Sequence, residues 1–147
     1  MLNLDFSGIE LQLKSKDGKT LVFDPVRKAW FILTPEEHIR QHILLYLVNV
    51  QHYPKGMIAL EKTIKVGNMN KRFDIVVYSR DHQPWMLIEC KAPEVEITEV
   101  TLHQLLNYQR TIQCRFWMLT NGHQSFCADA NDIKNIRWLQ ILPSYND

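Results

Sequence analysis

Three charged residues at the ends of two apolar segments form the most distinctive chemical pattern in the sequence. Asp74 lies in the apolar run 73–78, and Glu89 and Lys91 follow the apolar run 85–88. Paired carboxylates are hard oxygen ligands for a divalent cation, and a nearby ammonium stabilises negative charge in a transition state. The combination suggests metal-dependent phosphodiester chemistry.

The two apolar runs are predicted to pair as a β-hairpin. Both are rich in strand-forming residues, and the polar stretch 79–84 between them is typical of a turn. If the turn is centred near Asp81 and His82, Asp74 falls opposite Glu89, because residues equidistant from a turn pair across the ladder. The Asp74 and Glu89 carboxylates should therefore lie next to each other on neighbouring strands.

Strand alternation adds a third group to this pair. Glu89 and Lys91 should project on one face, while Cys90 points to the other and is expected to be a packed thiol rather than a nucleophile. Solvated rim charges or a modest ion pair are the alternative, since this spacing is common by chance. The apolar residues Leu87 and Ile88 favour a ligand-binding role, because a charge beside such a run is costly without a partner.

Composition indicates one soluble globular domain spanning residues 1–147. Apolar residues make up 46% and charged residues 22% of the 147, with no low-complexity tract. No signal sequence or membrane span is recognisable, and Cys90, Cys114 and Cys127 form no metal or disulfide pattern. We therefore expect a cytoplasmic protein with reduced, mostly buried thiols and no membrane association.

The net charge of +1 leaves the chain without a global basic surplus, so any nucleic acid that it binds as an isolated chain should bind weakly and in a salt-dependent way. Basic residues nevertheless gather around the predicted hairpin, either as a local binding surface or as a solvated strand face. They are Lys62, Lys65, Lys71, Arg72 and Arg80.

The first half of the chain reads as strands followed by a helix. Strands are predicted at 9–14, 20–23 and 29–33, and another at 57–66. Thr34 is the expected cap of the helix, with Pro35 in its first turn and Glu37 as a capping-box partner. The apolar stripe of this helix comprises Ile39, Ile43, Leu44, Leu47 and Val48.

The second half supplies a crossover connection. A helix is predicted over 98–112, capped by Thr98, and strands are predicted at 116–119, 124–127 and 136–142. Such a helix allows the strands at 85–88 and 116–119 to run parallel. The expected α/β fold is a mixed β-sheet flanked by helices, with N-terminal strands at 1–33 forming a β-hairpin extension, a core at 34–122 and C-terminal strands at 123–147. The apolar positions of the second helix include Val100, Leu102, Leu105, Leu106 and Ile112.

Six short motifs in this order resemble the PD-(D/E)xK nuclease superfamily, and more narrowly the N-terminal nuclease domain of type I restriction enzyme R subunits. The resemblance covers about Phe23 to Gly122, and it implies a restriction-endonuclease-like fold. The motifs are Asp24-Pro25-Val26-Arg27-Lys28, Thr34-Pro35-Glu36-Glu37-His38-Ile39-Arg40-Gln41, Lys71-Arg72-Phe73-Asp74, Ile88-Glu89-Cys90-Lys91-Ala92-Pro93, Gln104-Leu105-Leu106-Asn107-Tyr108 and Leu119-Thr120-Asn121-Gly122.

The resemblance implies roles for the central residues. Asp74 and Glu89 match the two metal-binding carboxylates, and Lys91 matches the lysine that orients or activates water. The implied cofactor is Mg²⁺, with Mn²⁺ able to substitute, and the Cys90 main-chain carbonyl is a further expected ligand. Phe73 stands where the superfamily has its name-giving proline, which removes no catalytic group.

Three further residues receive roles by the same resemblance. Gln104 and Tyr108 match an accessory QxxxY motif, and one helical turn would place both on one face. Glu37 is the candidate for an additional acidic group from the helix, in competition with its capping role.

The implied activity is that of a Mg²⁺-dependent DNA endonuclease or nuclease module. No Walker motif is present, so ATP-driven restriction would need a helicase, translocase or methylase partner. Two alternatives stay open: a non-catalytic scaffold that retains the nuclease fold, and a nuclease that acts in repair. The sequence leaves DNA preference and oligomeric state undetermined.

Other chemistries find less support in the sequence. His38 and His42 have a zinc-compatible spacing but no third ligand, and are interpreted as surface or capping residues. Most of the tryptophans are expected in the core rather than stacked on bases. They are Trp30, Trp85, Trp117 and Trp138.

Overall fold

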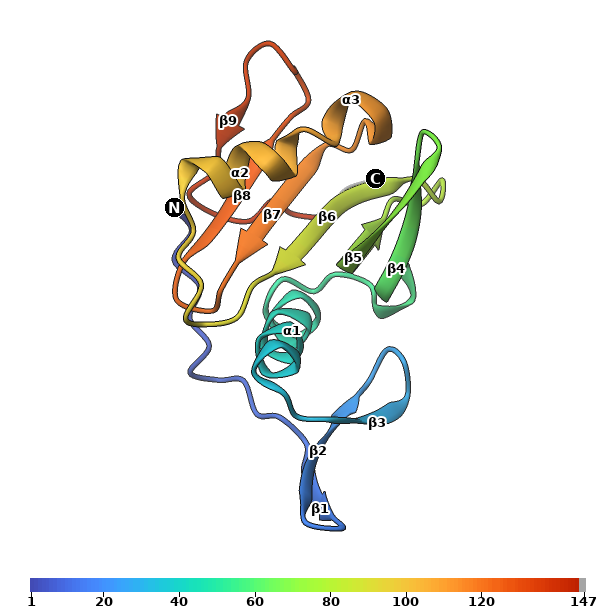
Figure 1. Cartoon of the computed structure of the whole chain (residues 1–147), viewed down its shortest axis with the longest axis vertical. Coiled ribbons are helices and arrows are strands. Elements are labelled where there is room, and N and C mark those ends of the chain that lie inside the picture. The colour runs from blue at the N-terminus through green and yellow to red at the C-terminus, as the bar shows by residue number, and fades with distance from the viewer. Residues whose placement is uncertain (146–147) are drawn as a thin grey trace.

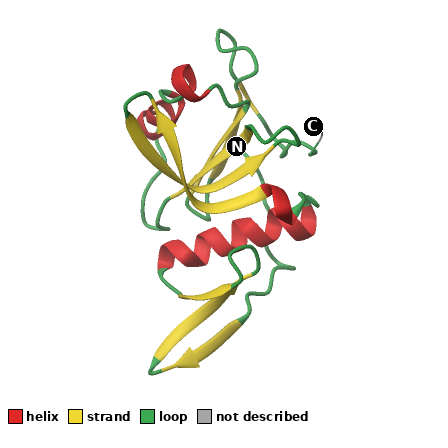
Figure 2. Cartoon of the chain, turned by 90° about the vertical axis from the view of Figure 1, so that its right-hand side faces the viewer, coloured by secondary structure: helices red, strands yellow, loops and turns green. Residues whose placement is uncertain are grey.

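The computed structural model describes residues 1–145, and within them the chain forms stacked layers (Figure 1). A three-stranded sheet, helix α1, a six-stranded sheet and the helices α2 and α3 follow one another (Figure 2). The elements are β1 Leu13–Lys16, β2 Lys19–Asp24, β3 Ala29–Ile32, α1 Pro35–Leu45, the π-helical turn Tyr46–Val50, the 3-10 turn Lys55–Met57, β4 Ile58–Val66, β5 Met69–Tyr78, β6 Pro84–Cys90, α2 Glu99–Leu106, α3 Gln109–Ile112, β7 Phe116–Thr120, β8 Ser125–Asp129 and β9 Arg137–Trp138.

The N-terminal extension is a sheet of order β1-β2-β3 rather than a hairpin alone. Asp17 and Gly18 both have positive φ, which gives the two-residue turn that matches the twist of a hairpin. This turn pairs Lys16 with Lys19 and fixes β1 at 13–16. The strand predicted at 9–14 is therefore wrong in position, because the turn and not the apolar pattern sets the register.

Helix α1 begins and packs as its sequence predicts. The Thr34 hydroxyl accepts a hydrogen bond from the Glu37 amide at 3.0 Å. The buried face of α1 rests on one face of the six-stranded sheet and holds Ile39, Ile43, Leu44 and, one turn beyond α1, Leu47. Burial of this face fixes α1 across the sheet.

The six-stranded sheet has the order β4-β5-β6-β7-β8-β9 and is mixed. β6 and β7 are parallel, while the other neighbouring pairs are antiparallel. This confirms the predicted crossover and the mixed sheet flanked by helices. The last strand is shorter than the predicted 136–142, because only Arg137 and Trp138 pair with β8.

The crossover helix is interrupted, in contrast to the continuous helix predicted over 98–112. α2 ends at Leu106, and α3 begins at Gln109 after Asn107 and Tyr108. Directly after the break, the buried Gln109 side chain accepts a hydrogen bond from the Trp117 indole on β7. This bond ties the start of α3 to the sheet.

The predicted core positions are mostly confirmed. The described thiols of Cys90, Cys114 and Cys127 are free and buried. Burial raises the pKa of Cys114 to about 12. Trp85 and Trp117 lie in the core, but Val100 and Trp138 are exposed. Val100 lies on the side of α2 that faces away from the sheet, so its apolar side chain wrongly indicates a core position.

Candidate functional site

The β5–β6 hairpin brings Asp74 and Glu89 to one level of the sheet. Ile75 pairs with Ile88 and Val77 with Met86, and one more step of this register puts Asp74 opposite Glu89. The Asp74 Oδ2 atom also accepts a hydrogen bond from the Cys90 amide at 2.8 Å. The predicted approach of these two carboxylates is confirmed.

A third carboxylate lies in the same row, on β4. Leu60 pairs with Ile75 and Lys62 with Phe73, so Glu61 falls opposite Asp74. Glu61 has a φ of +54° in the middle of the strand, a conformation that a non-glycine residue rarely adopts. Strained backbone therefore lies next to the candidate site.

Strand alternation is interrupted at this same row. Phe73 packs into the core beneath α2, whereas Ile75, two residues on, packs into the core beneath α1. Regular alternation would place both on one face. The interruption leaves Asp74 between the two cores, where its carboxylate contacts Arg40 of α1 and the Cys90 amide of β6.

Arg40 of α1 binds the carboxylates of β4 and β5 together. Its Nη2 atom lies 2.8 Å from the Asp74 Oδ1 atom and 2.6 Å from the Glu61 Oε1 atom. Its Nη1 atom lies 2.9 Å from Glu37. Burial alone would lower the pKa of Arg40, but the hydrogen bond to Asp74 and the charges of Glu37, Asp74 and Glu61 together raise it.

The Arg40 cluster continues into the N-terminal sheet. Glu37 accepts hydrogen bonds from Arg27 at 3.0 and 3.1 Å, and Gln41 donates to both Glu37 and Asp24. Asp24 also accepts from Arg27 at 2.7 Å. Burial would raise the pKa of Asp24, but its hydrogen bonds to Arg27, Gln41 and the Val26 amide lower it.

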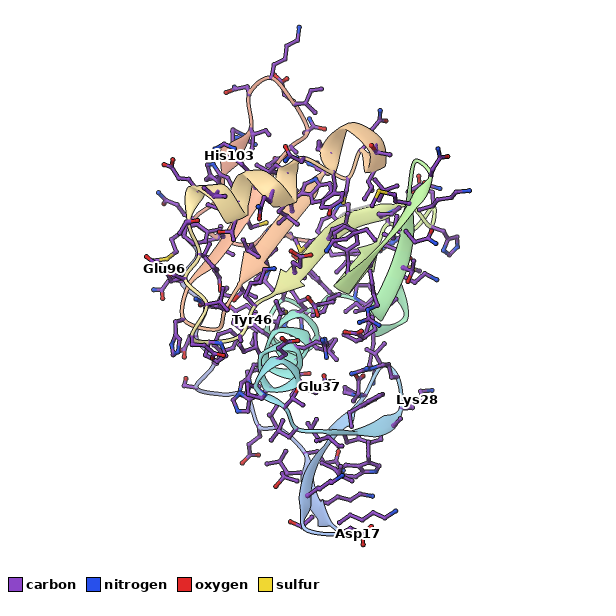
Figure 3. The ribbon with its side chains drawn as sticks, viewed as in Figure 1. Asp17, Lys28, Glu37, Tyr46, Glu96 and His103 are labelled. Atoms are coloured by element: carbon purple, nitrogen blue, oxygen red, sulfur yellow. The ribbon has the colours of Figure 1, made fainter. Side chains whose placement is uncertain are left out.

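Glu37 does not take its predicted capping-box role, and its role as an additional acidic group of the site stays a prediction. Its amide is capped by Thr34, but its own carboxylate turns to Arg27 and Arg40 and does not bond back to the start of the helix. Figure 3 shows Glu37 on the side of α1 next to the N-terminal sheet. Glu37 reaches Asp74 only through Arg40, so it supports the site from behind.

Glu89 is held from the opposite side, by lysines. Lys71 forms an ion pair with its Oε1 atom, and the Lys91 Nζ atom lies 3.7 Å from its Oε2 atom. These lysine side chains are 28% and 37% exposed, against 9% for Arg40. The convergence of Asp74, Glu89 and Lys91 predicted from the sequence is thus present in the structure.

Gln104 and Tyr108 lie beside Glu89, but not on one helix. Both line a hollow of about 580 Å³ whose wall also includes Lys71, Glu89 and Lys91. Gln104 belongs to α2, whereas Tyr108 precedes α3. The Lys71 ammonium lies 5.6 Å from the centre of the Tyr108 ring. Asn107 and Tyr108 keep right-handed helical φ and ψ, so the pair shares one hollow as its spacing of one helical turn predicts.

Asp74 and Glu89 both open into a second hollow, of about 300 Å³. Its wall is mostly polar and includes the residues Glu36, Arg40, Glu61, Lys71, Arg72 and Lys91. Among residues 1–145, no group of three or more His, Cys, Asp or Glu side chains is placed to hold a metal ion. A cation here would therefore rest on two carboxylates and main-chain oxygen.

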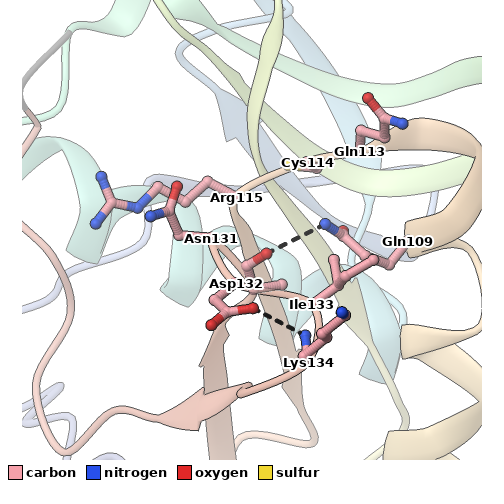
Figure 4. A pocket seen from close by; sticks show the side chains of 9 residues that line it. Gln109, Gln113, Cys114, Arg115, Asn131, Asp132, Ile133 and Lys134 are labelled. Atoms are coloured by element: carbon pink, nitrogen blue, oxygen red, sulfur yellow. Dashed lines mark hydrogen bonds between the residues drawn. The ribbon is translucent and has the colours of Figure 1, made fainter.

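Two other hollows offer less for catalysis. One, of about 600 Å³, lies between α3 and the loop after β8, and its polar groups bond to one another (Figure 4). His38 and His42 line another with His123, but this trio does not form a metal site among the described residues.

Cys90 is buried, and burial followed by the charge of Asp74 raises its thiol pKa well above the ordinary value.

Arg40 and Glu61 are site residues that the sequence prediction missed. Arg40 falls between Ile39 and Ile43 within the buried stripe of α1, and a cation there signals a buried ion pair. Glu61 and Asp74 lie on opposite sides of the turn at Gly67 and are the same number of residues away from it. Both signals are present in the sequence.

The sheet, its central hairpin and the flanking helices define a restriction-endonuclease-like α/β domain. The fold is similar to a fragment assigned as the HsdR subunit of a type I restriction enzyme from Vibrio vulnificus YJ016, with 18% identity and a TM-score of 0.55 over 76% of this chain. It is also similar to a protein of the DUF820 group from Anabaena variabilis ATCC 29413, assigned as a nuclease, with 16% identity and a TM-score of 0.51.

The sequence places the chain more narrowly. Residues 35–143 match the family described as the type I restriction enzyme R protein N terminus (HSDR_N), and the chain belongs to this family. It spans only 24% of the Vibrio chain, but 80% of the Anabaena chain and 88% of its own length in that match. Comparison with curated proteins gives no match.

Proposed function

We propose that this domain is a Mg²⁺-dependent DNA endonuclease, or the nuclease module of a larger restriction assembly. The observation that carries the proposal is the placement of Asp74 opposite Glu89 with Lys91 3.7 Å from Glu89. Family membership supports the same chemistry. Asp74, Glu89 and Lys91 are the proposed catalytic set, with Gln104 and Tyr108 as accessory residues in the adjoining hollow.

The donor set fits the proposed ion. Asp74 and Glu89 offer carboxylate oxygens, which Mg²⁺ prefers, and the Cys90 carbonyl lies on the chain between Glu89 and Lys91. When bound, Mg²⁺ supplies positive charge to the scissile phosphate and lowers the pKa of a water. Both carboxylates are paired with cationic side chains, Arg40 and Lys71, with which a metal ion would have to compete.

The side chains have distinct tasks in this proposal. The Cys90 amide and Arg40 hold the two oxygens of Asp74 and so fix its orientation. The Lys91 side chain is more exposed than that of Lys71 and lies 3.7 Å from Glu89. In this position its ammonium would orient the attacking water and stabilise charge on the phosphate. Lys71 balances the charge of Glu89 until substrate and metal arrive.

DNA is the proposed substrate, and a translocase or methylase subunit is the proposed partner. The proposal is supported by the family of the chain, the type I restriction enzyme R protein N terminus. It is also supported by the fact that the chain spans only 24% of the Vibrio HsdR fragment. A cytoplasmic location follows from the same proposal. No helix among residues 1–145 has the length and apolar character to cross a membrane.

The second candidate function is a scaffold that retains the fold without catalysis. The observation that favours it is the pairing of both carboxylates with Arg40 and Lys71, which would serve as a structural ion-pair network. A scaffold would keep these pairs and would gain nothing from a bound metal. Metal binding and cleavage therefore separate the two proposals.

The test combines calorimetric titration of Mn²⁺ with nicking of supercoiled plasmid in Mg²⁺. We expect Asp74→Ala to abolish both, and Lys91→Ala to retain Mn²⁺ binding but slow nicking by about 10²-fold or more. Asp81→Ala is the matched control, because it removes an exposed carboxylate at the other end of the same hairpin.

The outcomes discriminate between the proposals. Wild-type nicking by either Asp74→Ala or Lys91→Ala would overturn the catalytic proposal. Saturable Mn²⁺ binding without nicking would indicate that cleavage requires the partner subunit. Absence of Mn²⁺ binding in the wild type would favour the scaffold.

A further inference from the structure

The β4–β5 pair extends beyond the rest of the sheet as a two-stranded ribbon. β5 pairs with β6 from residue 75 onward, whereas residues 62–66 and 69–73 pair only with each other. We call residues 62–73 the ribbon. It projects at the right of Figure 1, and Glu61 and Asp74 flank it in the sequence. Its base is thus part of the candidate site.

The two faces of the ribbon differ in what they contact. Ile64 and Phe73 pack into the core beneath α2, so this inner face is occupied by the protein itself. The outer face consists of two directly opposed pairs, Thr63 with Arg72 and Lys65 with Asn70. All four outer residues are exposed, and every one of them carries a hydrogen-bond donor.

The ribbon is also strongly basic in a chain that is nearly neutral. Its twelve residues include Lys62, Lys65, Lys71 and Arg72 and no acidic residue, while the whole chain carries +1. Arg72 bonds to Glu61 at its base, at 3.0 Å. Within residues 1–145, Lys65 forms no salt bridge with an acidic side chain.

We propose that the outer face of the ribbon binds a groove of double-stranded DNA and delivers a phosphate to the site at its base. This inference rests on the proposed nuclease function and adds the form of the substrate and the surface that reads it. The major groove of B-DNA admits a two-stranded ribbon, and lysine, arginine, threonine and asparagine donors all bond to phosphates or base edges.

The direction of the ribbon supports this surface. Lys65 and Asn70 lie toward its tip and Arg72 toward its base, so donors lead from open solvent to Asp74. Duplex DNA along this line would contact Lys65 and Arg72 while the scissile phosphate approaches Lys91. The four basic residues of the ribbon supply local positive charge in a chain whose net charge is small.

The test measures binding of a short fluorescent DNA duplex by anisotropy, with Ca²⁺ in place of Mg²⁺ to prevent cleavage. We expect Lys65→Ala/Arg72→Ala to weaken binding by about 10- to 100-fold at low salt and to reduce the slope of log K against log salt by about 2. Lys16→Ala/Lys19→Ala is the charge-matched control, since it removes an exposed pair from the distant β1–β2 turn. We expect it to stay within about twofold of the wild type.

A second pair of variants tests the face rather than the charge. Lys65→Ala and Lys62→Ala each remove one ribbon cation, from the outer and the inner face respectively. We expect the outer variant to weaken duplex binding several-fold more than the inner one. Circular dichroism spectra of the variants confirm that each is folded.

The outcomes decide between this inference and the proposed function. Equal losses in the ribbon and control variants, or wild-type binding by Lys65→Ala/Arg72→Ala, would overturn the groove-binding surface even if Asp74-dependent nicking is present. Tighter binding of single-stranded than of duplex DNA, or no duplex binding by the wild type, would overturn it too. A selective ribbon effect in a protein that neither binds Mn²⁺ nor nicks DNA would instead reject the nuclease and keep the surface.

Discussion

Asp74 and Glu89 face each other across one hairpin, but the protein holds them by different means. Asp74 is bound by a main-chain amide and by Arg40, whose side chain is 9% exposed and contacts three carboxylates. Glu89 is bound by Lys71 and Lys91, which are 28% and 37% exposed. We call these the arginine half and the lysine half of the site.

The difference separates structure from exchangeable charge. A buried guanidinium with several carboxylate partners is strongly coupled to the fold, because removal of one member leaves buried charges unpaired. Ion pairs of exposed lysines are weaker, and solvent and salt compete with them. The arginine half should therefore hold Asp74 in place, whereas the lysine half can release Glu89 to a ligand.

The largest expected effect is from removal of the arginine. Arg40→Ala should destabilise the protein by about 3–5 kcal/mol, because Glu37, Glu61 and Asp74 lose a shared partner. Urea unfolding followed by fluorescence measures this change. Lys71→Met is the matched comparison, with an expected loss below about 1 kcal/mol. Equal losses in the two variants would show that the halves do not differ.

The next effect is acid sensitivity at Asp24, which is linked to the arginine half because Gln41 donates to both Asp24 and Glu37. The pKa of Asp24 is lowered in the folded state, so the unfolded chain binds more protons between the two pKa values and stability decreases as the pH is lowered. The contribution of Asp24 is full above the ordinary value of 3.8 and is lost as the pH falls through the lowered pKa.

Asp24→Asn tests this acid sensitivity. We expect about 2 kcal/mol of destabilisation at pH 7, where the charged acceptor is lost, and a weaker dependence of stability on pH below about 4. Unfolding curves at a series of pH values measure both. An unchanged acid slope would assign the sensitivity to other carboxylates.

The smallest expected effect belongs to the lysine half. Lys71 competes with any cation for Glu89, so Lys71→Met should raise Mn²⁺ affinity by about tenfold, equivalent to about 1.4 kcal/mol. Calorimetric titration at low salt measures this change, with Lys62→Met as a control on the same ribbon. A lower Mn²⁺ affinity in Lys71→Met would contradict the competition.

The sequence predicted the hairpin geometry because it depends on counting from a turn. Distances along the chain put Asp74 opposite Glu89, and the structure has this register. The same symmetry about Gly67 and Asn68 places Glu61 opposite Asp74, so this acid was also within reach of the sequence. Local patterns of this kind need no knowledge of packing.

The parts that escaped prediction depend on contacts between distant segments. Glu37 has the spacing of a capping-box residue, but Arg27 from the N-terminal sheet draws its carboxylate away. Gln109, just after the helix break, accepts a hydrogen bond from Trp117 on β7. Neither partner can be chosen from the sequence until the layers are packed.

The irregular end of the central hairpin separates its turn from the site. The register between β5 and β6 shifts between Val77 and Tyr78, so the turn at 79–83 is separated from the ladder that aligns the two carboxylates. A change of length in that turn, such as an inserted label, should therefore leave Asp74 opposite its partner. A single deletion between Met86 and Glu89 would instead present Cys90 to Asp74 in place of an acid.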